Sequence, residues 1–194
     1  MSIDIFLEEF KKIKFDPNIT HYLFKNALTS LPEFKAFTDY IEFSKTAGNF
    51  RSDTKGMYVL HTDPTNHDLS MFINALELRK KTRDIYGDEI DSVGITLLVS
   101  EYAKEDTDGA TGITKHYDQQ DTIHWACVGS SLWHIYKDEP DEIEFEYIVE
   151  PGDIMFAKKH IVHDVQSLSP RAACILTMHK NGVEYGQKPS TKNN

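Results

Sequence analysis

The sequence predicts an α+β protein in which helices come first and a small β-barrel follows. Before about residue 90, apolar residues recur every three or four positions, which is the period of an amphipathic helix. From Ile95 onward, short runs of β-branched and aromatic residues alternate with turn-forming residues, which is typical of strands. A chain of 194 residues is long enough to build one domain with a sizeable core.

Three helices are expected in the N-terminal half. The first covers Ser2 to Lys14, with its serine as the N-terminal cap. The second covers Leu31 to Lys45 and begins in a capping box, Ser30 to Glu33. The third covers Asp68 to Tyr86, is capped by its aspartate and ends before Gly87. Each carries one apolar face, so we expect these helices to cover the outside of the barrel.

The barrel is expected to begin with the strand Ile95 to Tyr102 and to centre on residues 112–171. Two runs rich in β-formers, Thr122 to Val128 and Leu132 to Tyr136, are joined by a Gly-Ser-Ser corner. A Pro-Gly-Asp turn at 151–153 precedes a further apolar strand. These patterns predict one domain.

We place this single domain at residues 1–186, with a mainly helical cover at 1–90 and the barrel core at 95–180. Residues 187–194 are rich in Ser, Thr, Lys and Asn and are expected to be a disordered tail.

Composition narrows the classes of partner. The net charge of −10 makes nucleic acid an unlikely ligand, and the one basic cluster, Arg79 to Arg83, is expected to be a solvated face, although a partner surface there stays open. No apolar run approaches the roughly 18 residues of a membrane-spanning helix, so no membrane association is expected. The two cysteines, Cys127 and Cys174, lie in expected strands without metal-ligand spacing. We interpret them as reduced core thiols of a cytoplasmic protein.

Three residues of the barrel stretch form a candidate metal site. His116 and Asp118 are two positions apart, so in a strand they point to the same side. His163, on a later strand, could complete one face of an octahedron. Two histidines and one carboxylate with open positions form the ligand set of non-haem Fe(II) oxygenases. The sequence therefore predicts an Fe(II) site at these three residues.

Two motifs carry a resemblance to a known family. His116 to Asp121, followed by Gly129 and by Trp133 to Tyr136, resembles the first motif of the cupin-type JmjC hydroxylases. Glu150 to Phe156, followed by Val162 to Val165, resembles their second motif. The resemblance implies a double-stranded β-helix, the cupin or jelly-roll barrel, with the N-terminal helices packed on its outside. It also implies an Fe(II)- and 2-oxoglutarate-dependent dioxygenase that uses O2 to hydroxylate a protein side chain or a small molecule.

The residues that hold 2-oxoglutarate follow less directly from the resemblance. Family members usually anchor its far carboxylate with a lysine, and the matching position here is Ser131. Arg171 lies eight residues after His163, where other Fe(II)/2-oxoglutarate oxygenases such as prolyl hydroxylases place an arginine or lysine. An arginine fork bonds a carboxylate bidentately. The alternative is a solvent-exposed arginine at a strand edge. By strand parity with His116, Thr114 is expected to face the pocket, where it contacts the cosubstrate or simply packs.

Two other functions remain open from the sequence. A cupin barrel can house a metal-dependent reaction or bind a small ligand without using 2-oxoglutarate, and the serine at 131 favours this reading. A metal-free β-barrel that serves protein interactions is the third alternative. Beyond the metal and cosubstrate ligands, no catalytic residue is predicted. The identity of the substrate and the pairing of two copies into a homodimer also stay open.

Overall fold

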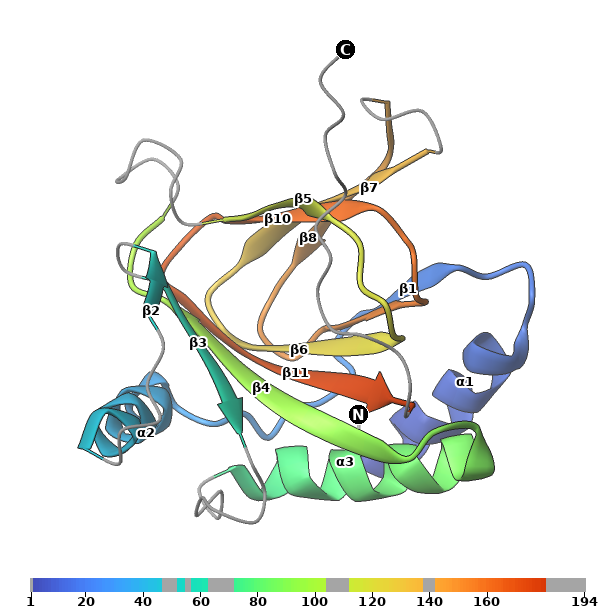
Figure 1. Cartoon of the computed structure of the whole chain (residues 1–194), viewed down its shortest axis with the longest axis horizontal. Helices are drawn as coiled ribbons and strands as arrows, with labels where there is room; N and C mark the ends of the chain where they lie inside the picture. The colour runs from blue at the N-terminus through green and yellow to red at the C-terminus, as the bar shows by residue number, and fades with distance from the viewer. Residues whose placement is uncertain are drawn as a thin grey trace.

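The computed structural model of the chain describes residues 2–46, 52–54, 57–62, 72–103, 112–137 and 142–180. It is mostly β-structure with few helices: two antiparallel sheets face each other, and α1 and α3 lie along the outer side of the larger one (Figure 1). The helices are α1 (Ile3–Phe15), α2 (Phe34–Thr46) and α3 (Ile73–Tyr86), with the short 3₁₀ helix η2 (Gly87–Glu89) directly after α3. The strands are β1 (His21–Phe24), β2 (Ser52–Thr54), β3 (Met57–Thr62), β4 (Ser92–Ser100), β5 (Ile113–His116), β6 (Thr122–Val128), β7 (Ser131–Tyr136), β8 (Ile143–Val149), β9 (Ile154–Ala157), β10 (His163–Ser167) and β11 (Arg171–His179).

Strands that follow one another along the chain belong mainly to different sheets. The larger sheet has the order β1-β9-β6-β11-β4-β3-β2, and the smaller has the order β5-β10-β7-β8. From β4 onward, successive strands fall mainly in opposite sheets, so the chain winds back and forth across the space between them. Residues far apart in sequence are thereby brought to one interior.

The core has two parts because the larger sheet is covered on both faces. One face packs against the helices through side chains such as Phe10, Trp125 and Phe156. The other face meets the smaller sheet through a second cluster that includes Met155 and Trp133. Burying apolar area stabilises by about 25 cal/mol per Å², so both layers help to hold the sheets in register.

The helix predictions are largely confirmed. In α1, Ser2 is the N-cap and its Oγ accepts from the Ile5 amide at 3.5 Å. The C-terminal end of α3 is confirmed too, since its C-cap Gly87 has a φ of 54°, which favours glycine. The predicted cap Asp68 lies outside the described residues.

The predicted start of α2 is wrong. The helix begins at Phe34, and the capping box at Ser30 does not form. Tertiary hydrogen bonds hold the preceding segment in a non-helical path: the Leu28 amide donates to the Gly152 carbonyl at 3.0 Å, and Asn74 donates to the Ser30 carbonyl at 2.9 Å. A local capping signal is outweighed here by contacts with distant parts of the chain.

The N-terminal part of the chain holds α1, α2 and α3, and it also supplies β1, β2 and β3 to the larger sheet. The tail predicted at 187–194 lies outside the described residues, and the single-domain assignment stays a prediction. Cys127 and Cys174 are buried and free, with their Sγ atoms 4.0 Å apart, as expected for core thiols. None of the described helices is long and apolar enough to cross a membrane.

Candidate metal centre

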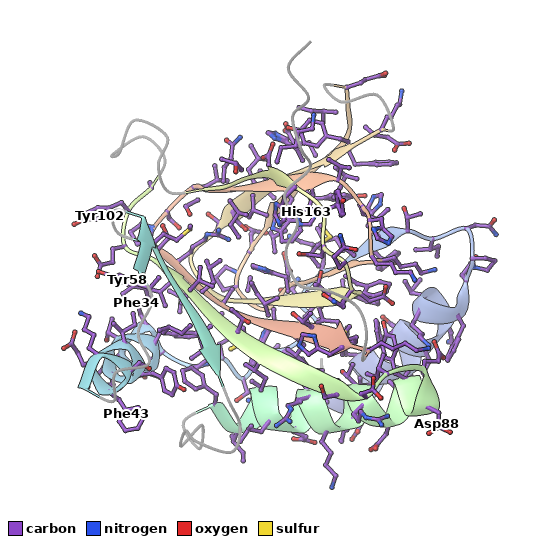
Figure 2. All side chains as sticks on the ribbon, viewed as in Figure 1. Phe34, Phe43, Tyr58, Asp88, Tyr102 and His163 are labelled. Atoms are coloured by element: carbon purple, nitrogen blue, oxygen red, sulfur yellow. The ribbon has the colours of Figure 1, made fainter. Side chains whose placement is uncertain are left out.

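The structure brings the three predicted ligands together on the smaller sheet. His116 at the end of β5 is the register partner of His163 at the start of β10. Asp118 lies just beyond β5, and one ligand atom from each of the three residues falls within 4.8 Å of the others. His163 is buried, while the other two are half-buried. In Figure 2 the labelled His163 lies on the far side of the β-structure from α3.

Backbone carbonyl groups fix both imidazole rings. The Nδ1 of His116 is 2.8 Å from the Thr114 carbonyl oxygen, and the Nδ1 of His163 is 2.9 Å from that of Ile161. A carbonyl oxygen can only accept, so each Nδ1 carries the hydrogen and each Nε2 keeps a free lone pair. This is the tautomer that a metal ion needs, held by the kind of outer contact that orients metal-binding histidines.

The free Nε2 atoms face one carboxylate. Asp118 Oδ1 is 3.9 Å from His116 Nε2, and Asp118 Oδ2 is 3.9 Å from His163 Nε2. Metal–ligand bonds to nitrogen and oxygen are about 2.0–2.2 Å long, so one ion between them would draw the three groups slightly closer. Burial, and then the neighbouring His116, lower the pKa of His163, which keeps its ring neutral and able to bind.

Two loops that carry ligands are clamped to each other. The His160 amide donates to the Asp118 carbonyl at 2.8 Å, and the Lys159 amide donates to Asp121 Oδ1 at 3.0 Å. The Tyr86 hydroxyl at the end of α3 donates to the other oxygen of Asp121 at 2.8 Å. The side chain of His160 itself is exposed and packs on the Tyr117 ring, outside the cluster.

Arg171 is buried at the start of β11, so the reading of it as a solvent-exposed residue is wrong. Only 2% of it is exposed, and its Nε donates to Ser167 Oγ at 2.8 Å. Its Nη1 and Nη2 atoms are buried and have no hydrogen-bond partner within the described part of the chain. Burial lowers the pKa of Arg171 to about 10, so it stays charged at neutral pH. A buried guanidinium with unmet donors is a site suited to an anion.

The other two predicted cosubstrate residues differ in their setting. Ser131 is buried on β7 and is the register partner of Ser167, the residue that holds Arg171. Thr114 is exposed, and a register shift between β5 and β10 falls in the same stretch. A contact of either residue with a cosubstrate stays a prediction.

Sequence reasoning could not place two interior residues of this region. Trp133 stacks on the His163 ring, with centroids 5.1 Å apart and planes at 12°. His124 meets Trp133 edge-on, with centroids 5.1 Å apart. The missed signal is the alternation within β6, where Ile123 and Trp125 pack toward the helices and His124 points to the other face.

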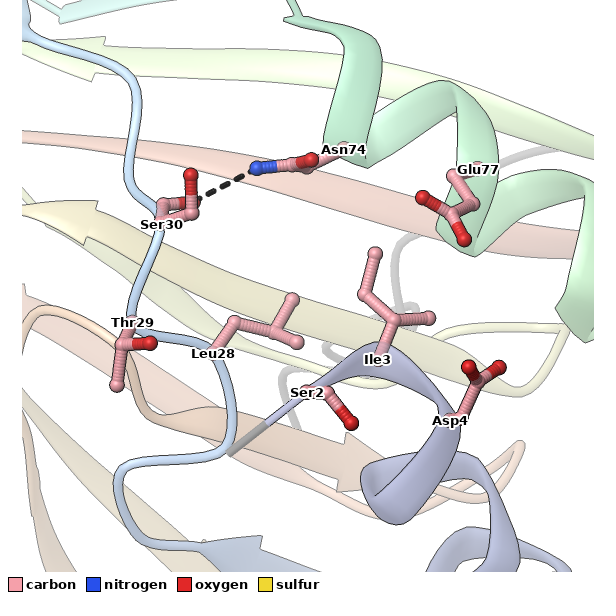
Figure 3. Close-up of a pocket in the computed structure, with 8 residues that line it drawn as sticks. All are labelled: Ser2, Ile3, Asp4, Leu28, Thr29, Ser30, Asn74 and Glu77. Atoms are coloured by element: carbon pink, nitrogen blue, oxygen red, sulfur yellow. Dashed lines mark hydrogen bonds between the residues drawn. The ribbon is translucent and has the colours of Figure 1, made fainter.

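A separate pocket of about 410 Å³ lies away from this cluster, beside the N-terminal ends of α1 and α3 (Figure 3). It is lined by Ser2, Ile3, Asp4, Leu28, Thr29, Ser30, Asn74 and Glu77. It shares no residue with the candidate metal ligands, and its Asn74 amide is already used by the Ser30 carbonyl.

Comparison with solved structures shows that the chain has the fold of known oxygenases. It is similar to the ribosomal oxygenase YcfD from Escherichia coli, with a TM-score of 0.58, 15% identity and 90% of this chain covered. The match covers 56% of that protein, so the chain spans little more than half its length. It is also similar to a prolyl-4-hydroxylase from Pseudomonas putida, with a TM-score of 0.57 and 9% identity, over 93% of this chain and 100% of the other.

Some of the similar structures carry ligands, and one of them is relevant to the candidate metal centre. It is YcfD in complex with cobalt and 2-oxoglutarate, with a TM-score of 0.56 and 15% identity, over 90% of this chain and 57% of that one. At these identities the likeness establishes the fold. No family model matches the sequence, and no curated protein matches it.

Proposed function

We propose that this protein is an Fe(II)- and 2-oxoglutarate-dependent oxygenase that hydroxylates a protein side chain or a small molecule. The observation that carries the proposal is the pairing of two features in one interior. A two-histidine, one-carboxylate cluster lies in the same barrel as a buried arginine whose Nη atoms lack partners within the described residues.

The strand order supports the finer fold assignment, a double-stranded β-helix. Strands β9-β6-β11-β4 form the centre of one sheet, and β5-β10-β7-β8 form the other. Eight strands alternating between two facing four-stranded layers match the wound barrel of this fold. The helices and β1 to β3 then extend and cover one layer.

The donor set fits the proposed metal and cosubstrate. His116, Asp118 and His163 would hold Fe(II) through two neutral imidazoles and a carboxylate, which leaves positions open. Bound Fe(II) supplies the oxidising chemistry with O2 and 2-oxoglutarate, with succinate and CO2 as products. Arg171 would hold the far carboxylate of 2-oxoglutarate bidentately, and the buried walls around Trp133 would exclude water.

The proposed substrate class rests on the neighbours and not on this chain alone. One similar structure is named a ribosomal oxygenase and another a prolyl-4-hydroxylase, and one contains cobalt with 2-oxoglutarate. We extend a protein or small-molecule substrate and these cosubstrates to this chain as part of the proposal. A cytoplasmic location and a homodimer are likewise proposals.

A second candidate is a cupin-type metal enzyme or ligand-binding protein that does not use 2-oxoglutarate. The observation in its favour is the buried serine at position 131, where the resembled family has a charged lysine. Arg171 outweighs this observation because it supplies a buried positive charge next to the same serine pair.

The test is an anaerobic loading and turnover experiment with the full chain. We expect the Fe(II)-loaded protein to consume 2-oxoglutarate and release succinate once O2 is admitted, while His163→Ala fails to retain the metal. His160→Ala is the matched control, because this histidine lies outside the cluster and should keep both properties. We expect Arg171→Met to keep the metal and to weaken 2-oxoglutarate binding by at least about 10-fold, with Arg171→Lys intermediate. A metal-loaded protein that leaves 2-oxoglutarate untouched would favour the second candidate.

A further inference from the structure

His124 lies in the space between the two sheets, on the central strand β6. Its neighbours Ile123 and Trp125 belong to the core that packs against the helices. Since successive residues of a strand point to opposite faces, His124 points to the interior of the barrel. It is only 3% exposed.

The imidazole of His124 is linked by aromatic contacts to the candidate metal centre. Its ring meets the Trp133 ring at 78°, with centroids 5.1 Å apart, and Trp133 stacks in turn on His163. The three side chains come from both sheets, and His124 and His163 both contact the Trp133 ring.

Two groups at opposite ends of the proposed cosubstrate site, Arg171 and His163, act electrostatically on His124. Burial, then the Arg171 charge and then His163 lower the pKa of His124 well below its ordinary value. Its ring is thus neutral at pH 7 and carries one N–H donor and one acceptor nitrogen. A positively charged side chain at this position would be repelled by Arg171. A carboxylate side chain at the same position would repel an anionic ligand.

Charge counting explains why a neutral donor suits this position. The two negative charges of 2-oxoglutarate and the one of Asp118 balance the two charges of a divalent ion and the one of Arg171. A further charge inside the barrel would be costly in its low-dielectric interior. A neutral N–H still contributes a charge-assisted hydrogen bond to a carboxylate without upsetting the balance.

We propose that His124 is a second cosubstrate-binding residue, which donates an N–H to an oxygen of the dicarboxylate held between Arg171 and the metal centre. This inference rests on the proposed function and deepens it. It assigns the cosubstrate site to two strands of the larger sheet, β11 through the arginine and β6 through the histidine. The candidate metal ligands lie on or directly after the strands β5 and β10 of the smaller sheet.

The test separates cosubstrate binding from metal binding. The full chain is loaded with Co(II), and its affinity for Co(II) and then for 2-oxoglutarate is measured by calorimetry. For His124→Leu we expect 2-oxoglutarate binding to weaken about 10- to 100-fold, as for a lost hydrogen bond to a charged group. We expect Co(II) affinity to change less than about 3-fold, because the metal ligands are untouched. His124→Gln keeps a neutral donor and should recover most of the 2-oxoglutarate affinity.

Two controls keep a structural role apart from a binding role. His134→Gln alters another buried histidine, one that faces away from the barrel interior and bonds Asp164, and it should bind 2-oxoglutarate as the unaltered protein does. If His124→Leu does not fold, His124→Met fills the same space and also lacks a donor. Thermal unfolding of each variant without ligand shows whether it is folded.

Three results would overturn the inference. The first is 2-oxoglutarate binding by a folded His124→Leu or His124→Met protein at the affinity of the unaltered chain. The second is equal weakening in His124→Gln and His124→Leu together with a loss of Co(II) affinity, which would indicate a purely structural residue. The third is an unaltered protein that binds Co(II) but not 2-oxoglutarate, which would remove the proposed function as well and is thus distinguishable from the first two.

Discussion

At the scale of single residues, the candidate ligands are oriented by the backbone. Each histidine uses Nδ1 on the carbonyl two residues before it and turns Nε2 toward Asp118. The local chain conformation therefore sets the tautomer. Trp133 then covers the buried ring of His163 from one side, which makes this tryptophan a natural reporter of metal binding.

Metal binding is expected to quench tryptophan emission. Co(II) held at His163 would lie close to the stacked Trp133 ring, whereas Trp125 packs toward the helices. Titration of the full chain with Co(II) should therefore quench part of the fluorescence, and Trp133→Phe should remove most of that quenching. Trp125→Phe is the matched control and should retain it. Equal quenching in both variants would contradict the placement of the ion.

The metal-free protein is expected to lose stability in acid. Burial is the main cause that lowers the pKa of His21, His124 and His163 in the folded chain. Unfolding restores a pKa of about 6.5. Below that pH the unfolded chain takes up protons that the folded chain does not, so the free energy of unfolding falls as pH falls.

The size of this effect can be measured in a single variant. Each such histidine contributes at most about 1.4 kcal/mol per pH unit. Urea unfolding in the presence of a chelator, between about pH 8 and pH 5, should show the decline. In His124→Gln the free energy of unfolding should depend less steeply on pH, by the uptake of up to one proton. An unchanged slope in this variant would contradict a neutral, buried His124.

At the scale of elements, the sequence was informative where one face of an element is buried and the other is not. The apolar face of α1 and its serine cap are such a case, and they are confirmed. In β6, Ile123 and Trp125 alternate with His124, but both faces of the strand are buried, so the sequence did not show which face meets the smaller sheet. The predicted start of α2 failed because distant carbonyl and amide groups hold the segment before it.

The candidate site shows the same division between local and long-range information. The pair at 116 and 118 and the motif around His163 could be read from the sequence, because each lies within a short pattern. Arg171 is buried at the start of β11, which lies between β6 and β4 near the centre of the larger sheet. The stacking of Trp133 on His163 depends on the pairing of β7 with β10. Such contacts arise from topology, which the sequence pattern does not state.

A polar network on the outer face of the smaller sheet is expected to stabilise β10. Asp164 accepts from the Tyr136 hydroxyl, and its Oδ1 is 3.1 Å from His134 Nδ1. The other ring nitrogen of His134 is 3.2 Å from Glu146, so the network joins β10, β7 and β8. Asp164→Ala would leave a largely buried histidine and a tyrosine hydroxyl without this acceptor, at a cost of about 1–3 kcal/mol.

Urea unfolding of the metal-free protein measures this cost. Glu144→Ala, an exposed change on the neighbouring strand β8, is the control and should alter stability by less than about 0.5 kcal/mol. Equal stability of Asp164→Ala and the control would show that the outer network does not hold the sheet together.

At the scale of the whole molecule, the space between the two sheets holds a charged side chain whose terminal donors have no partner within the described residues. Arg171 is buried with both Nη atoms unpaired within the described residues, and burial lowers its pKa. An uncompensated buried charge destabilises the fold, and an anion that binds it restores stability by mass action. The cost of the arginine to the free protein and the affinity for the proposed cosubstrate are therefore two aspects of one interaction.

This coupling predicts that removing the charge stabilises the free protein. Methionine has a similar length and no charge. Without ligand, the free energy of unfolding of Arg171→Met should therefore equal or exceed that of the unaltered chain, with a gain of at most about 1–4 kcal/mol. With Co(II) and 2-oxoglutarate at about 100 times its dissociation constant, the unaltered chain should gain about 2.7 kcal/mol from the ligand. Arg171→Met should gain little, while its response to Co(II) alone is unchanged. Thermal unfolding under the three conditions measures each step. A variant that loses stability without ligand, yet is stabilised by 2-oxoglutarate as strongly as the unaltered chain, would show that Arg171 is a structural residue and that the anion binds elsewhere.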